Sequence, residues 1–461
     1  MFFGLSLLTI FMGGTLVLLP GLSRRVESLT HTVLVLAGCG LGLVPAWHAL
    51  AGQKLSSVLV SWSVPVGRIE LGIDSLSGLF LLLHFIVSAA AVLFGSSYFE
   101  PYEEERSLKP VRFFISGFII SIALVLAAQN AVLFLVSWEM MALGGFFLVA
   151  FEGQELQVRK AALLYLVATH IGTLCLFVAF GLLGMSTGSF AFPQMAGNPA
   201  LLAVSTPIFV LALLGFGSKA GFVPLHIWLP EAHPAAPSPV SALMSGVMIK
   251  TGIYGLLRVL GFFAQPPAWW GFTLGAIGIL SGTLGILWAL AQSDFKRLLA
   301  YSSIENVGII TLGLGIGYLG VSFRNPLIAL FGLGGRLVAC GQPWFFQKHA
   351  LFSRGIRAPC DGITRDGQTG RALQKNALHG LGCAHGIHRD LWPAALQRIY
   401  QRVADLFRRV SFGVGTGSVP SRGRPGSRLD RGVGGRMLQQ SFWRAVSGCG
   451  ADRERISGEG V

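Results

Sequence analysis

The chain has 461 residues, of which 52% are hydrophobic and only 12% are charged, and its mean hydropathy is +0.64. Because about a quarter of the residues in soluble globular proteins are charged, this composition excludes a soluble enzyme, a nucleic-acid-binding protein and a disordered chain. The formal net charge of +14 is nevertheless large for a chain with so few charged residues.

The positive charge is concentrated in the last part of the chain. Residues 1–335 contain 15 basic and 13 acidic residues, whereas residues 336–461 contain 20 basic and 8 acidic residues, and 18 of those 20 are Arg. Cysteine divides in the same way, because only Cys39 and Cys175 lie in the apolar part. The cysteine spacings are not those of a disulfide framework or a zinc site, so we predict no metal ion on this chain.

Apolar runs of about 20 residues are long enough to cross the hydrocarbon core of a bilayer. The sequence predicts such spans at residues 2–20, 30–50, 72–96, 112–128, 130–151, 160–184, 201–229, 238–263, 270–291, 297–320 and, incompletely, 325–340. Only Gln129 and Asn130 separate the fourth and fifth runs, which predicts a tight helical hairpin. No basic residue precedes the first run, so we interpret it as a retained span and not as a signal peptide. The predicted fold class is therefore all-α, a polytopic transmembrane helical bundle.

The loops predict an orientation, because Lys and Arg accumulate on the cytoplasmic side of a membrane. Alternate loops carry nine basic residues, namely Arg24, Arg25, Arg106, Lys109, Arg112, Arg159, Lys160, Lys296 and Arg297. The opposite loops carry only Lys54, Arg68 and Arg324. The N-terminus is thus predicted to be non-cytoplasmic, and Asp74 and Asp294 are predicted to cap helices at the interface.

A few ionisable residues lie within the predicted spans, where a charge costs several kcal/mol unless it is paired or hydrated. Glu139, Lys219 and Lys250 are too deep to reach the interface, and His226 and His170 can exchange protons near neutral pH. Because intramembrane charges mark transport pathways by default, we predict a proton relay through Glu139, Lys219, His226 and Lys250, with His170 and His233 on a secondary polar path. The alternatives are structural: lysines held by helix-end carbonyls, a neutral Glu139 that hydrogen-bonds between helices, and a His226 that satisfies a freed carbonyl.

The spans that carry these residues also contain helix breakers. The seventh run is interrupted by Gly215, Gly217, Gly221 and Pro224, and the connection to the eighth contains Pro230, Pro234, Pro237 and Pro239. Broken helices at membrane depth are tolerated where they meet protein or line a cavity, so we predict discontinuous helices. A carboxylate that approaches or leaves a desolvated lysine changes its affinity for protons, so a Glu139–Lys219 pair that forms and separates could relay protons.

Three stretches resemble a known family: WEMMALGGFFLVAFE around Glu139, FGFGSKAGFVPLHIWLPEAHPAAPSPVSALMSGVMIKTGIYG around Lys219 and Lys250, and SDFKRLLAYSSIENVGII from Ser293. They are similar to the antiporter-like membrane subunits shared by respiratory complex I, Mrp-type cation/proton antiporters and membrane-bound nickel-iron hydrogenases. The resemblance covers nearly all of residues 1–335. Within this family, the segments EMMAL, EAHPAAPS and LLAYSSIEN are most similar to those of subunits of the hydrogenase-4 component B and formate hydrogenlyase subunit 3 type.

The resemblance implies a role for each of four residues. Glu139 corresponds to the family's helix-five glutamate, Lys219 to the broken-helix lysine that pairs with it, Lys250 to the central lysine that passes protons onward, and His226 to a polar residue between them. Residues 1–110 would be N-terminal transmembrane helices, and residues 111–335 a truncated antiporter-like proton-translocation domain.

The implied function is movement of protons or Na+ across the bacterial inner membrane, coupled to electron transfer in a hydrogenase-4 or formate hydrogenlyase type complex. Redox chemistry would lie on partner subunits, so no catalytic residue, flavin, iron–sulfur centre or nickel is expected on this chain. The expected partners are other membrane and hydrophilic subunits of such an assembly and the lipid bilayer, with no nucleic acid. Two alternatives remain open, a redox-independent cation/proton antiporter subunit and a proton-pumping subunit of complex I.

The resemblance stops after Gly335. Residues 336–461 are rich in Arg and Gly, contain no run long enough to span a bilayer, and are predicted to be disordered. Synonymous codons for Arg336–Phe352, read from the next base, permit ALLHVVNHGFSKSTLF, and Leu396–Val410 in the same phase permits FNGFISEWLIYFGA; both continue the family pattern. We therefore hypothesise that this tail is a frameshift product. The alternative is a genuine tail that binds anionic lipid headgroups. The nucleotide sequence across codon 335 separates the two. A third reading of the function, beside the relay and the antiporter, is that the chain as written does nothing.

Overall fold

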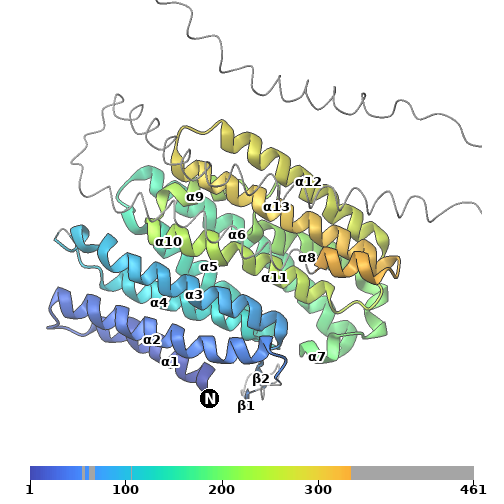
Figure 1. Ribbon diagram of the computed structural model, residues 1–461, viewed down its shortest axis with the longest axis horizontal. Helices are drawn as coiled ribbons and strands as arrows, with labels where there is room; N and C mark the ends of the chain where they lie inside the picture. Colours follow the sequence, from blue (N-terminus) through green and yellow to red (C-terminus); the bar gives the residue numbers. More distant parts are fainter. Residues whose placement is uncertain (54–57, 62–67, 105, 334–461) are drawn as a thin grey trace, which may run out of the picture. The chain divides into compact units, whose positions relative to one another are not determined.

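The computed structural model describes residues 1–333 except 54–57, 62–67 and 105 (Figure 1). The predictions made for residues 336–461, that they are disordered and out of frame, lie outside these described residues. Nine helices in the described part are long and apolar enough to cross a membrane, and the shorter apolar segment Phe2–Leu18 precedes them. The chain is therefore a multi-pass membrane protein, and the predicted all-α transmembrane bundle is confirmed.

The elements follow the chain in a simple order. The α-helices are α1 (Phe2–Thr15), α2 (Arg24–Leu50), α3 (Ser75–Tyr98), α4 (Lys109–Ala127), α5 (Ala131–Val149), α6 (Leu156–Thr187), α7 (Phe192–Met195), α8 (Ser205–Ala220), α9 (Leu229–Ala235), α10 (Ser238–Leu243), α11 (Ile249–Leu260), α12 (Ala268–Leu290) and α13 (Phe295–Ser322). Short 3₁₀ turns are η1 (Leu16–Leu18), η2 (Glu100–Glu103), η3 (Ala150–Glu152) and η4 (Pro199–Val204), and η5 (Met244–Met248) is a π-helical turn. The long helices lie side by side (Figure 1).

Helix caps define several of these boundaries. Asn130 caps α5 by accepting a hydrogen bond from the Val132 amide at 2.7 Å, so that α4 and α5 form the predicted tight hairpin. Asp74 caps α3 by accepting from the Ser77 amide at 2.8 Å, and Asp294 caps α13. Both aspartates therefore have the capping role that the sequence predicted.

A short antiparallel hairpin precedes α3. Strand β1 (Val58–Ser61) pairs with β2 (Arg68–Leu71) in the register Val58↔Leu71 to Ser61↔Arg68. The sequence prediction assigned no element to this stretch and began the third span at residue 72, whereas α3 begins at Ser75. The alternation of apolar and polar residues here is too short to stand out beside the long apolar runs.

The predicted span 201–229 is not one helix. Helix α8 ends at Ala220 because Gly221 adopts the left-handed conformation with φ +81°, and α9 starts only at Leu229. The next span changes from α10 to the π turn η5 and then to α11, and all of its residues from 238 to 260 are buried except Arg258. The prediction of discontinuous helices is therefore confirmed, and the second of them lies in the centre of the bundle.

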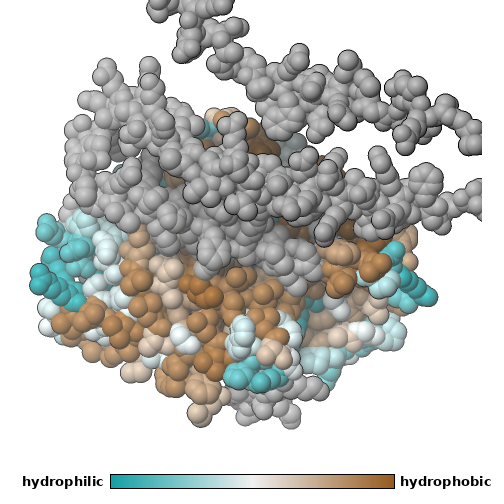
Figure 2. Space-filling model, in the orientation of Figure 1, coloured by the Kyte–Doolittle hydropathy of each residue, from teal (hydrophilic) through white to brown (hydrophobic). Residues whose placement is uncertain are grey.

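The outer surface has the polarity of a membrane protein. Figure 2 shows apolar residues across the middle of the visible face and hydrophilic residues toward the ends of the helices. Large apolar side chains project outward from separate helices, including Trp47 (65% exposed), Leu174 (64%) and Phe272 (60%). Such exposure suits contact with lipid or with another membrane subunit.

Loops that were predicted to share a side of the membrane contact one another. On one side, Gln129 Nε2 donates to the Gly72 carbonyl at 3.0 Å and the Gly197 amide donates to the Phe262 carbonyl at 2.8 Å. On the other side, the contacts are Lys109 with Glu27 at 3.1 Å, Arg106 with the Phe151 carbonyl at 3.1 Å and Lys296 with the Ala236 carbonyl at 2.9 Å. The loops thus alternate between the two ends of the bundle in the predicted order.

Candidate functional site

Lys219 lies in the last turn of α8 and is almost completely buried, with 1% of its surface exposed. Its ammonium group donates a hydrogen bond to the Tyr165 hydroxyl at 3.1 Å. The Nζ atom also lies 5.1 Å from the centre of the Tyr165 ring and 5.9 Å from that of Trp138. A cation at the C-terminus of a helix is favoured by the helix dipole, and the two rings add cation–π attraction.

Tyr165 connects Lys219 to the broken span that follows. It lies on α6, is fully buried, and its hydroxyl donates to Met248 Sδ at 3.4 Å, in the π turn immediately before α11. A Cβ atom on Gly145 of α5 would overlap the Tyr165 hydroxyl. The close approach of α5 and α6 at this point therefore requires glycine. Sequence reasoning missed Tyr165, although a tyrosine inside an apolar span needs a partner for its hydroxyl.

Glu139 on α5 faces His170 on α6, with Glu139 Oε2 and His170 Nε2 3.3 Å apart. The other carboxylate oxygen, Oε1, is buried and has no hydrogen-bond partner among the described residues. The carboxylate also acts electrostatically on both Lys219 and Tyr165. In this structure Glu139 therefore pairs with His170, and Tyr165 takes the place next to Lys219 that the sequence prediction gave to Glu139. The reason is geometric, because α6 inserts its Tyr165 side chain between α5 and α8.

Lys250 is the second residue of α11, directly after the π turn, and only 5% of its surface is exposed. The turn is stabilised at this point by Thr251, whose hydroxyl donates to the Met248 carbonyl at 2.6 Å. Single π turns inside helices occur frequently at functional sites. Met248 thus lies between the Tyr165 hydroxyl and the start of the helix that carries Lys250.

The two remaining predicted histidines lie closer to α12 and α13. His226, in the segment between α8 and α9, stacks on Trp288 with ring centres 4.8 Å apart and faces Tyr301 at 6.5 Å. His233 lies on α9 and is buried, with 2% of its surface exposed. His226 Nδ1 and His233 Nε2 are both buried and form no hydrogen bond within the described residues. The structure therefore brings Glu139, His170 and Lys219 together and places His226 and His233 in a separate region.

A bundle of apolar helices with two discontinuous spans and buried ionisable side chains between them is typical of the membrane subunits of transport and respiratory complexes. Residues 128–333 match the model of one family within that class, described as NADH:quinone oxidoreductase/Mrp antiporter, transmembrane region. The chain belongs to this family, and the match ends two residues before Gly335.

Individual relatives agree with this assignment. Hydrogenase-4 component B of Escherichia coli (strain K12) is 41% identical over 287 residues, which are 62% of this chain and 42% of the relative. Formate hydrogenlyase subunit 3 of the same strain is 31% identical over 319 residues, 69% of this chain and 50% of the relative. A chain of the membrane-bound sulfane sulfur reductase, an archaeal respiratory membrane complex, has a TM-score of 0.59 and 27% identity, over 73% of this chain and 56% of that one. The chain thus spans about half the length of the curated relatives or less.

Proposed function

We propose that this chain relays protons across the bacterial inner membrane, with its N-terminus on the non-cytoplasmic side, as a subunit of an assembly of the hydrogenase-4 or formate hydrogenlyase type. The observation that carries the proposal is the buried contact between the Lys219 ammonium and the Tyr165 hydroxyl, next to the Glu139–His170 pair. A buried ammonium is costly, and intramembrane charges are retained mainly where an ion or proton must pass.

The Tyr165 hydroxyl is proposed to relay a proton between Lys219 and Lys250. It accepts a hydrogen bond from Lys219 and donates one to the Met248 thioether, which is not basic enough to take up the proton. A hydroxyl has one donor hydrogen and two acceptor lone pairs, so it can exchange these roles. Transfer from Lys219 toward Lys250 is therefore proposed to run through Tyr165 when its hydroxyl hydrogen turns from Met248 toward a water molecule or toward Lys250.

His170 is proposed to control how strongly Glu139 acts on Lys219. A protonated His170 would neutralise the carboxylate 3.3 Å away, whereas a neutral imidazole would leave the negative charge free to attract a proton to Lys219. The His170 side chain is 45% exposed halfway along α6, so we propose that it exchanges protons with water or a polar group that a neighbouring subunit brings to this face. Glu139 and His170 would thus form the entrance of the relay.

His226 and His233 are proposed as a second polar path. Each keeps one buried ring nitrogen that forms no hydrogen bond within the described residues, so that nitrogen can accept or release a proton. The sequence prediction put His226 in the main relay and His170 in the second path; because His226 packs against α12 and α13, we propose the reverse assignment for these two histidines.

The energy source is proposed to be electron transfer on partner subunits, because the relatives named above include hydrogenase and formate hydrogenlyase subunits. Lys219→Ala, made in the full-length assembly, should abolish proton pumping by membrane vesicles while the assembly and electron transfer persist. Lys160→Ala is the matched control, because Lys160 is an exposed lysine at the start of α6 and should leave pumping unchanged. Unaffected pumping by an intact Lys219→Ala assembly would refute the proposal. Exchange of Na+ for protons without any electron donor would favour the antiporter alternative.

A further inference from the structure

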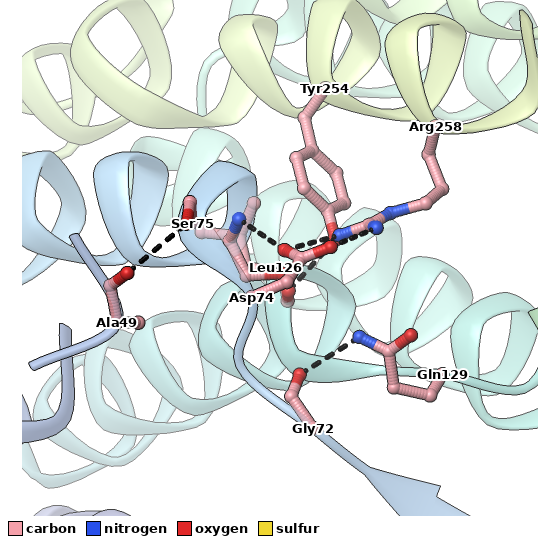
Figure 3. A network of polar contacts seen from close by, with 9 residues as sticks. Ala49, Gly72, Asp74, Ser75, Leu126, Gln129, Tyr254 and Arg258 are labelled. Carbon is pink, nitrogen blue, oxygen red and sulfur yellow. Dashed lines mark hydrogen bonds and ion pairs between the residues drawn. The ribbon is translucent and has the colours of Figure 1, made fainter. Parts of the chain in front are cut away.

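A second ionic cluster joins the end of α11 to the beginning of α3 (Figure 3). The Arg258 guanidinium contacts both carboxylate oxygens of Asp74, with Nη1 to Oδ2 at 2.5 Å and Nη2 to Oδ1 at 2.9 Å. A guanidinium and a carboxylate in this two-fold geometry form one of the strongest ion pairs in proteins. The cluster therefore fixes the α11 helix, which carries Lys250, to α3.

The same guanidinium also forms hydrogen bonds with two hydroxyl groups, those of Tyr254 and Ser77. Arg258 Nη2 lies 2.8 Å from the Tyr254 hydroxyl and 2.9 Å from Ser77 Oγ, so its two hydrogens are shared among these two oxygens and Asp74 Oδ1. The Tyr254 hydroxyl in turn donates to the Leu126 carbonyl at 2.8 Å. The single hydrogen of Tyr254 is thus used in one bond, and its oxygen already accepts a bond from a cation.

These groups stand between Lys250 and the surface. Lys250, Tyr254 and Arg258 follow one another at intervals of four residues, which places them along one face of α11. Eight residues of helix correspond to about 12 Å along its axis. The Arg258 side chain is 12% exposed and that of Asp74 is 48% exposed, so the cation faces the interior and the anion faces outward.

Neither charged group can take up a proton and release it again at neutral pH. The guanidinium of arginine does not lose its proton in proteins. Burial by itself raises the pKa of Asp74, but the hydrogen bonds and charge of Arg258 outweigh this effect and lower the pKa to about 2. The carboxylate therefore remains ionised, and a chain of polar groups that could have conducted protons ends at a fixed positive charge.

We propose that Arg258, held in place by Asp74, is an electrostatic barrier that stops protons on Lys250 from leaking to the membrane surface at this end of α11. An inward-facing fixed cation raises the energy of a second positive charge nearby, as the arginines of selective membrane pores do. The inference rests on the proposed proton relay, because it assumes that Lys250 carries protons. Its consequence is that removal of the barrier converts coupled transport into passive leak.

The test measures passive proton leak of membrane vesicles that contain the full-length assembly, after a pH gradient is imposed without any electron donor. The double variant Asp74→Asn/Arg258→Met removes both charges together, so no unpaired buried charge remains. We expect a roughly tenfold faster leak, which corresponds to about 1.4 kcal/mol of barrier. A leak rate equal to that of the wild type would overturn the proposal.

Two further variants separate a barrier from general loosening of the bundle. Glu231→Gln/Arg297→Gln removes an ion pair whose side chains are 43% and 44% exposed, and should leave the leak unchanged. Adding Lys250→Ala to the double variant should return the leak to the wild-type rate, whereas a leak that persists without Lys250 contradicts the barrier.

If the double variant fails to assemble, Arg258→Gln decides the question, because it removes the cation while the half-exposed Asp74 carboxylate can be hydrated. A faster leak in Arg258→Gln supports the barrier, and a wild-type rate overturns it. Donor-driven pumping by the wild type, measured in the same vesicles, tests the proposed function independently.

Discussion

Replacement of Tyr165 by Phe tests whether the relay depends on one hydroxyl group. The substitution keeps the ring, which packs against Trp228 with ring centres 5.1 Å apart, and removes the atom that accepts the hydrogen bond from Lys219. A hydrogen bond to a charged group contributes about 1.5–3 kcal/mol. Because each 1.36 kcal/mol changes a rate about tenfold, we expect proton pumping to fall by about 10- to 150-fold.

The assay is donor-driven acidification of membrane vesicles, normalised to the amount of assembled complex and to the rate of electron transfer. Tyr98→Phe, a tyrosine at the end of α3 outside the site, is the matched control and should pump as the wild type does. Pumping by an assembled Tyr165→Phe variant at the wild-type rate would refute the role of the hydroxyl.

Two other predictions concern the packing of the site and the ion pair of Figure 3. Gly145→Ala should displace the Tyr165 hydroxyl, because the added Cβ overlaps it, and should reduce pumping without loss of assembly; a wild-type rate would contradict the close contact. Asp74→Asn should lower stability by about 1 kcal/mol, a value reduced for the half-exposed carboxylate by solvent screening. Because the Asp74 pKa is lowered from 3.8 to about 2, this difference should be complete above pH 4 and shrink as the pH falls toward 2. Thermal unfolding of the two proteins in detergent across this range measures it, and a difference that grows on acidification contradicts the assignment.

Much of the membrane bundle could be predicted because its determinants are local. Apolar runs are read directly from hydropathy, and Gly221 and Pro224 indicated the break after α8 that the structure contains. The burial of Lys219 and Lys250 also followed from their apolar surroundings in the sequence. Alternation of the loops required only that each run cross the membrane once.

The side-chain partners could not be predicted in the same way. Helices that are apolar on all sides give no periodic signal for the face that each turns toward its neighbours. The pairing of Glu139 with His170, and the placement of Tyr165 beside Lys219, depend on the rotation of α5, α6 and α8. The contact between Arg258 and Asp74 joins residues 184 positions apart, for which the sequence offers no local indication.

Proton translocation by the purified full-length assembly in liposomes, compared between Glu139→Gln and the wild type, tests most directly whether the buried cluster around Lys219 relays protons. The substitution keeps the shape of the side chain and removes the charge that acts on Lys219 and Tyr165. We expect electron transfer to continue in Glu139→Gln while proton uptake or release across the membrane is lost. An equal number of protons moved per electron pair by Glu139→Gln and the wild type would contradict the relay.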